Sequence, residues 1–137
     1  FATLASPAWP TAPERLYQMF ADEYERCFDP RGVARQLAAL IANGDRRPLL
    51  RRIAKPCVVL HGAADQLIPS ACGEDVARNI PGAEMRIIEG MGHDFPVPLS
   101  GVFADAICAA ASRSGLIPEP SGSIPQRKNK AKLRITG

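Results

Sequence analysis

Two short apolar runs in the middle of the chain show no alternation with polar residues. Val58, Val59 and Leu60 form the first run, and Ile87 and Ile88 belong to the second. Strands covered on both faces of a parallel sheet have this pattern, whereas strands with one wet face alternate. The two runs therefore predict neighbouring buried strands of a parallel sheet, which is the α/β fold class.

The segment between the runs, residues 70–80, predicts the crossover helix that parallel neighbours require. Ser70 is a suitable N-terminal cap, and Glu74 and Asp75 place negative charge in the early turns, where the helix dipole favours it. A Pro-Gly pair then ends the helix. Because parallel strands end at one edge of the sheet, the loops after the two runs would meet in the crevice where such sheets bind ligands.

Nearer the N-terminus, apolar residues recur at steps of three and four. Residues 14–27 predict one helix, which ends before Pro30. Asp29 and Pro30 predict the cap and first turn of a second helix, and Gly44 closes it. The apolar face of the second helix would consist of Val33, Leu37, Leu40 and Ile41.

Each of the two apolar runs leads into a turn-rich loop with reactive side chains. Asp65 follows the first run in the segment His61-Gly-Ala-Ala-Asp65, and His93 follows the second in Gly90-Met-Gly-His93-Asp. A carboxylate that orients an imidazole is the acid and base arrangement of nucleophilic hydrolases. Asp65 and His93 are therefore the candidate catalytic residues.

These two motifs, in this order and with a helix between them, resemble the last two strands of the α/β-hydrolase fold. The resemblance covers roughly residues 14–112 and is closest to small ester- and lactone-cleaving members, including polyketide methyl-esterase-like proteins. It implies that Asp65 is the acid after the seventh strand and His93 the base after the eighth. It implies acyl transfer from a small-molecule ester, with neither a cofactor nor a metal.

The nucleophile of that family is absent from the sequence. The family carries Ser in a Gly-x-Ser-x-Gly elbow, but Ser6 is the only serine before Asp65 and has no flanking glycines. Cys27 lies in a helical pattern and Cys57 opens an apolar run. The oxyanion hole, which depends on the elbow, is absent too. We therefore expect a chain that begins at Phe1 by truncation, whose partner is the missing N-terminal half of the same fold, and that is inactive alone.

The resemblance implies the end of a helical cap over residues 1–45 and the C-terminal core with the acid and base loops over 46–114, and composition predicts a disordered basic tail over 115–137. The tail is rich in Pro, Ser and Gly and lacks apolar periodicity. It carries five basic residues, Arg127, Lys128, Lys130, Lys132 and Arg134, against Glu119 alone, a net charge of +4 that exceeds the +3 of the whole chain. Nucleic-acid binding is not expected, because no aromatic residue is interleaved for base stacking.

Composition is that of an ordinary soluble protein, with 46% apolar and 23% charged residues. No apolar run approaches the roughly 18 residues of a membrane span, and the start lacks a signal-peptide pattern. No membrane contact and a cytoplasmic location are expected. The four cysteines have no zinc-site spacing and are interpreted as reduced, buried or half-buried thiols.

Several other residues are expected to have structural rather than catalytic roles. His61 is expected to pack and hydrogen-bond locally, and Asp94 to cap its loop; neither Asp94 nor Glu89 replaces Asp65 as the acid. The arginines of residues 46–52 are expected on a solvated helix face. One stripe of large side chains is expected to belong to the hydrophobic core rather than to line a substrate pocket: Trp9, Met19, Phe20, Tyr24 and Phe28.

Three function classes stay open. The first is an ester hydrolase. The second keeps the fold but uses an Asp nucleophile, as dehalogenases and epoxide hydrolases do, and only the missing elbow would distinguish it. The third is a non-catalytic binding module, which the presence of both Asp65 and His93 disfavours.

Overall fold

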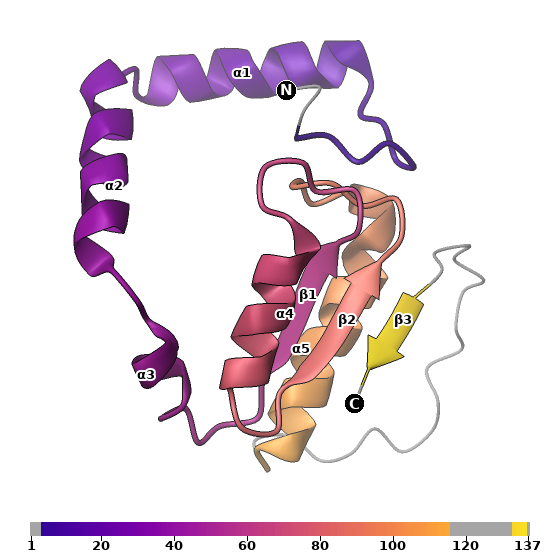
Figure 1. The fold of residues 1–137 in the computed structure, drawn as a ribbon. Coiled ribbons are helices and arrows are strands. Elements are labelled where there is room, and N and C mark those ends of the chain that lie inside the picture. The colour runs from indigo at the N-terminus through magenta and orange to yellow at the C-terminus, as the bar shows by residue number, and fades with distance from the viewer. Residues whose placement is uncertain (1–3, 116–132, 137) are drawn as a thin grey trace.

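The two predicted strands lie side by side and are parallel. In the computed structural model, which describes residues 4–115 and 133–136, strand β1 is Val58–Gly62 and strand β2 is Glu84–Ile88. Their register places Val58 beside Glu84 and Gly62 beside Ile88. Helix α4, Ser70–Asn79, connects them. Both strands therefore end at the same edge of the sheet, the upper one in Figure 1.

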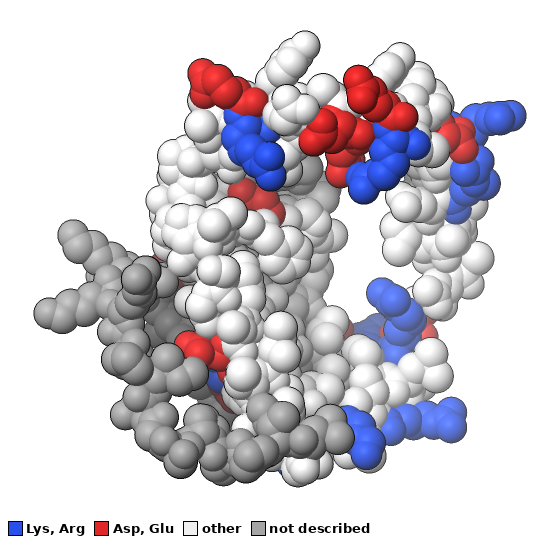
Figure 2. Space-filling view, turned by 180° about the vertical axis from the view of Figure 1, so that it is seen from behind, with Lys and Arg blue, Asp and Glu red and all other residues white. Residues whose placement is uncertain are grey.

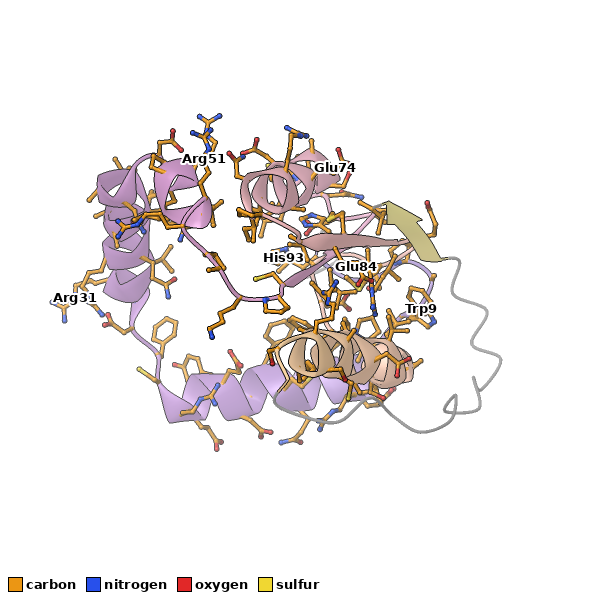
Figure 3. The ribbon with its side chains drawn as sticks, turned by 90° about the horizontal axis from the view of Figure 1, so that it is seen from below. Trp9, Arg31, Arg51, Glu74, Glu84 and His93 are labelled. Carbon is orange, nitrogen blue, oxygen red and sulfur yellow. The ribbon has the colours of Figure 1, made fainter. Side chains whose placement is uncertain are left out.

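Helices cover both faces of these strands. Helix α4 packs on β1 and β2, and helix α5, Ser100–Arg113, packs on β1; Figure 3 shows the two helices on opposite sides of the sheet. A short 3-10 helix, η1, Val97–Leu99, leads into α5. The Arg113 guanidinium fixes the far end of α5, because it lies 3.3 Å from the Glu84 carboxylate and donates to the Cys57 carbonyl at 3.0 Å. The observed architecture is a small layered α/β arrangement.

The core is a compact cluster next to the loop that follows β2. Ile88, Met91 and Leu99 are buried, and four partly buried side chains pack against them: Trp9, Leu60, Val102 and Phe103. The prediction that the first run is fully buried is wrong, since Val58 to Leu60 are only half-buried. The reason is that β1 has a neighbouring strand on one side only in the described sheet.

A third strand, β3, Leu133–Thr136, pairs antiparallel with β2. The prediction of a disordered tail over residues 115–137 therefore does not hold for these four residues. Apolar and polar residues alternate in Leu-Arg-Ile-Thr, but the run is too short to predict a strand. Residues 116–132 lie outside the described residues.

The helices near the N-terminus begin and end where the sequence predicts. Helix α1 is Pro13–Arg26 and helix α2 is Pro30–Asn43. The Asp29 carboxylate accepts a hydrogen bond from the backbone N–H of Arg31 at 3.1 Å, and Gly44 closes α2 with φ of 60°. The predicted cap of α4 is wrong, however, because Ser70 already belongs to the helix and no side chain caps it.

Helices α1 and α2, together called the arm, contain no buried residue. Figure 1 shows them passing across the top and down one side of the core, and the space-filling view in Figure 2 shows open space between arm and core. Of the predicted stripe, Trp9 packs on the core cluster, and the prediction of a core position is wrong for the others. The other members lie 40–67% exposed: Met19, Phe20, Tyr24 and Phe28.

Of the arginines in residues 46–52, Arg47 lies in the short helix α3, Arg47–Leu50, and Arg46 and Arg51 flank it. All four arginines of residues 46–52 are exposed, and Arg47 pairs with Asp45 at 3.0 Å.

The four cysteines are free thiols, but the expectation of burial is wrong, because only Cys57 is half-buried and the other three are exposed. Within the described ranges, no helix is long and apolar enough to cross a membrane.

Candidate active site

The loops that follow β1 and β2 are joined by backbone hydrogen bonds. The N–H of Ala63 donates to the carbonyl of Ile88 at 3.0 Å, and the N–H of Ala64 donates to that of Met91 at 2.9 Å. A Cβ at Gly62 would lie 2.2 Å from the Met91 carbonyl oxygen. Only glycine permits this approach, which brings the loop with the acid against the loop with the base.

Asp65 is held by hydrogen bonds at both carboxylate oxygens. Its Oδ1 accepts from the backbone N–H groups of Leu67 and Ile68, each at 2.9 Å, and its Oδ2 lies 2.8 Å from Nδ1 of His93. The side chain is only 4% exposed. Burial raises the pKa of Asp65, but the Ile68 N–H, the His93 ring and the Leu67 N–H favour the charged form and together hold the pKa below its ordinary value.

His93 meets Asp65 through one of its two ring nitrogens. A carboxylate only accepts hydrogen bonds, so Nδ1 of His93 carries the proton and Nε2 carries the lone pair. The side chain is 42% exposed. No hydrogen-bond partner of Nε2 occurs among the described residues. The hydrogen bond to Asp65 therefore fixes which nitrogen of a neutral His93 ring carries the proton.

His61 supports the acid loop from beneath. Its Nε2 donates to the carbonyl of Ile68 at 2.8 Å and lies 3.6 Å from Oδ2 of Asp65, with 13% of the side chain exposed. A Cβ at Gly73 of α4 would come within 2.6 Å of the ring. This is the local packing and hydrogen bonding that the sequence predicts for His61.

The base loop is bound by an N-terminal segment, residues 4–9, called the strap below. The carbonyl of Leu4 accepts from the N–H of His93 at 2.8 Å. The Ser6 hydroxyl accepts from the N–H of Gly92 at 2.9 Å and donates to the carboxylate of Asp94. From its sequence context Ser6 is only a poor candidate nucleophile, and this structural role is not predicted. No local signal reveals it, because the partners lie 86 and 88 residues away.

No nucleophile is in place at the imidazole. Ser6 is fully buried with its hydroxyl engaged elsewhere. Cys27 is exposed just after α1, and the Cys57 thiol lies at the start of β1 near the Lys55 carbonyl, at 3.3 Å. In the part of the chain that the structure describes, no serine or cysteine is hydrogen-bonded to His93.

Two hollows on the surface lie away from the acid–base pair. One, of about 590 Å³, lies between the start of β1 and α5 and is lined by apolar residues such as Val58, Leu60 and Ile107. The other, of about 700 Å³, lies between α3 and α4. Neither is lined by Asp65 or His93, so neither provides the walls of a substrate pocket for this pair.

The described side chains include no group of three or more His, Cys, Asp or Glu placed to hold a metal ion. The site therefore consists of the hydrogen-bonded Asp65 and His93, with His61 and the strap beside them.

No protein-family model matches the chain, and no curated protein matches it either.

Proposed function

We propose that Asp65 and His93 are the acid and base of an α/β-hydrolase-type enzyme that cleaves a carboxylic ester or lactone by acyl transfer. The observation that carries the proposal is the 2.8 Å contact between Oδ2 of Asp65 and Nδ1 of His93. Both side chains leave the carboxyl ends of adjacent parallel strands, which is where open α/β sheets place their ligands.

Each residue has a defined task in this proposal. His93 accepts a proton through Nε2 from an attacking hydroxyl and returns it to the leaving group. Asp65 keeps the proton on Nδ1 and stabilises the imidazolium that forms. Since the Asp65 pKa is held low, the carboxylate is charged at neutral pH and suited to this task.

The nucleophile and the oxyanion hole are proposed to come from outside these 137 residues, because the sequence contains no Gly-x-Ser-x-Gly elbow. Loss of a single oxyanion donor costs roughly a hundredfold to a thousandfold in rate. The 137 residues alone are therefore proposed to show no meaningful turnover, and activity belongs to the protein as it is naturally produced.

The test is the hydrolysis rate of a short-chain aryl ester by the naturally produced protein. His93→Ala is expected to remove nearly all turnover, and Asp65→Asn to lower kcat by up to about four orders of magnitude, since the wrong tautomer is then favoured. The control is Asp105→Asn, which changes an exposed carboxylate on α5 and should keep the wild-type rate. Near-native turnover by either site variant, with circular dichroism unchanged, would contradict the proposal.

The same assay separates the competing chemistries. A burst of acyl-enzyme in the wild type supports a Ser nucleophile. Turnover of a haloalkane or an epoxide without ester cleavage would instead indicate an Asp nucleophile. Ligand binding that is unaffected by His93→Ala, with no turnover of any of these substrates, would indicate a binding module.

A further inference from the structure

Ser6 has an environment unlike that of any other serine described in the chain. It is 0% exposed, and it is the one buried polar residue among the described residues. Its hydroxyl is used in both directions, as acceptor for the N–H of Gly92 and as donor to the carboxylate of Asp94. A buried hydroxyl costs free energy unless it is paired, so this position is specified by its two partners.

Those partners are the two neighbours of His93. The strap therefore binds three consecutive residues: the N–H of Gly92 through Ser6, the N–H of His93 through the Leu4 carbonyl at 2.8 Å, and the Asp94 carboxylate through Ser6 again. The fit is close, because a Cβ at Gly92 would lie 2.6 Å from the carbonyl oxygen of Leu4. Figure 1 shows the strap beside the loops at the upper ends of β1 and β2.

We propose that Ser6 is a positioning residue for His93, acting through Gly92 and Asp94 to fix the backbone from which the imidazole projects. This inference rests on the proposed function for its catalytic meaning. His93 is exposed, and among the described residues its ring is hydrogen-bonded to Asp65 alone, so this one contact does not determine where Nε2 points. A general base must be held to within about 0.5 Å of its productive geometry, and the strap supplies that constraint.

A purely structural role for Ser6 makes a different prediction. If Ser6 only filled a buried space, its loss would lower stability and leave the His93–Asp65 hydrogen bond as it is in the folded protein. If Ser6 positions His93, its loss weakens that bond while the fold persists. The bond is visible in proton NMR as a downfield signal from Nδ1–H of His93, whose exchange with water reports how well the contact is held.

The experiment compares Ser6→Ala with wild type in the naturally produced protein, by this signal and by ester hydrolysis. We expect faster exchange or loss of the Nδ1–H signal, and a fall in kcat of about ten- to a hundredfold at unchanged KM, since a small displacement of a catalytic group has effects of that size. Ser112→Ala, at a half-buried position of α5, is the matched control and should change neither. A wild-type signal and wild-type exchange in folded Ser6→Ala would overturn the inference.

A second pair of variants decides the question if Ser6→Ala does not fold. Asp94→Asn keeps an oxygen that accepts from Ser6 and should preserve the signal, whereas Asp94→Ala removes the acceptor and should lose it. Equal signals in the two would overturn the inference. Failure of the proposed function is a separate result: turnover would then be independent of His93, while the dependence of the Nδ1–H signal on Ser6 and Asp94 would stand.

Discussion

The strap and the arm are neighbours in sequence but differ in how they contact the core. The strap is six residues without regular structure, yet it contains the fully buried Ser6 and binds the base loop. The arm is two helices of 14 residues each, and neither has a buried residue. The longer and more regular segment therefore contributes less to the site than the short irregular one.

The difference lies in what each segment meets. The helices of the arm follow from signals within their own sequence, such as the Asp29 cap and the Gly44 stop. The strap has no such local signal, and its conformation depends on the carbonyls and N–H groups of the base loop. The presence of a helix thus reflects the conformational preference of the local sequence, whereas the burial of a side chain reflects its contacts with distant parts of the chain.

The largest predicted effect comes from equal truncations in the two regions. Leu99 is 1% exposed in the core cluster, and Leu40 of α2 is 63% exposed. Leu99→Ala should cost about 2–5 kcal/mol of unfolding free energy through lost burial and a cavity, while Leu40→Ala should stay within about 0.5 kcal/mol. Urea unfolding measures both. Similar losses at the two positions would show that the arm packs on the core.

Glycine-to-alanine substitutions compare the core and the arm by how closely other atoms approach the backbone. In Gly62→Ala the new Cβ would meet the Met91 carbonyl at 2.2 Å, whereas at Gly32 of α2 the nearest contact is the Arg35 side chain at 3.7 Å. Overpacking at residue 62 should cost about 1–3 kcal/mol. Gly32→Ala should raise local helicity without raising the thermal midpoint of the core, because helix α2 has no buried residue. Thermal unfolding followed by near-ultraviolet circular dichroism distinguishes the two, and a destabilised Gly32→Ala would contradict the account.

A smaller effect should separate two carboxylates whose pKa values are both lowered. Asp65 is buried against its donors, whereas Asp45, beside the arm, owes its low pKa to hydrogen bonds from exposed Arg47. A depressed folded-state pKa gives stability that is present above the unfolded value, about 3.9, and lost as the pH falls through the folded value. Asp65→Asn should therefore reduce the loss of stability between about pH 5 and the acid limit, and Asp45→Asn should reduce it much less, because Asp45 and Arg47 are exposed and solvent screens their interaction. The reverse ranking in acid-unfolding curves would contradict this assignment.

Local sequence patterns predicted those parts of the fold that depend on residues close together in the chain. The apolar runs gave the parallel pair β1 and β2, and the capping residues gave α1 and α2 to within one residue. The same reasoning missed β3, because residues 133–136 form a strand by pairing with β2, which is distant in the sequence. It also placed Asp65 and His93 in loops at one edge of the sheet, where their side chains meet. It did not find Ser6, because nothing near Ser6 in the sequence indicates Gly92 or Asp94.

The most direct test of the central claim is the tautomer of His93, measured by nitrogen NMR of the imidazole rings at about pH 8, where an ordinary imidazole is neutral. The chain has two histidines, and the structure predicts opposite tautomers for them. His61 donates from Nε2 to the Ile68 carbonyl, whereas His93 donates from Nδ1 to Asp65. The account predicts a protonated Nδ1 and a free Nε2 at His93, with His61 as the internal reference. A His93 ring protonated on Nε2 would contradict the assignment of Asp65 and His93 as an acid–base pair.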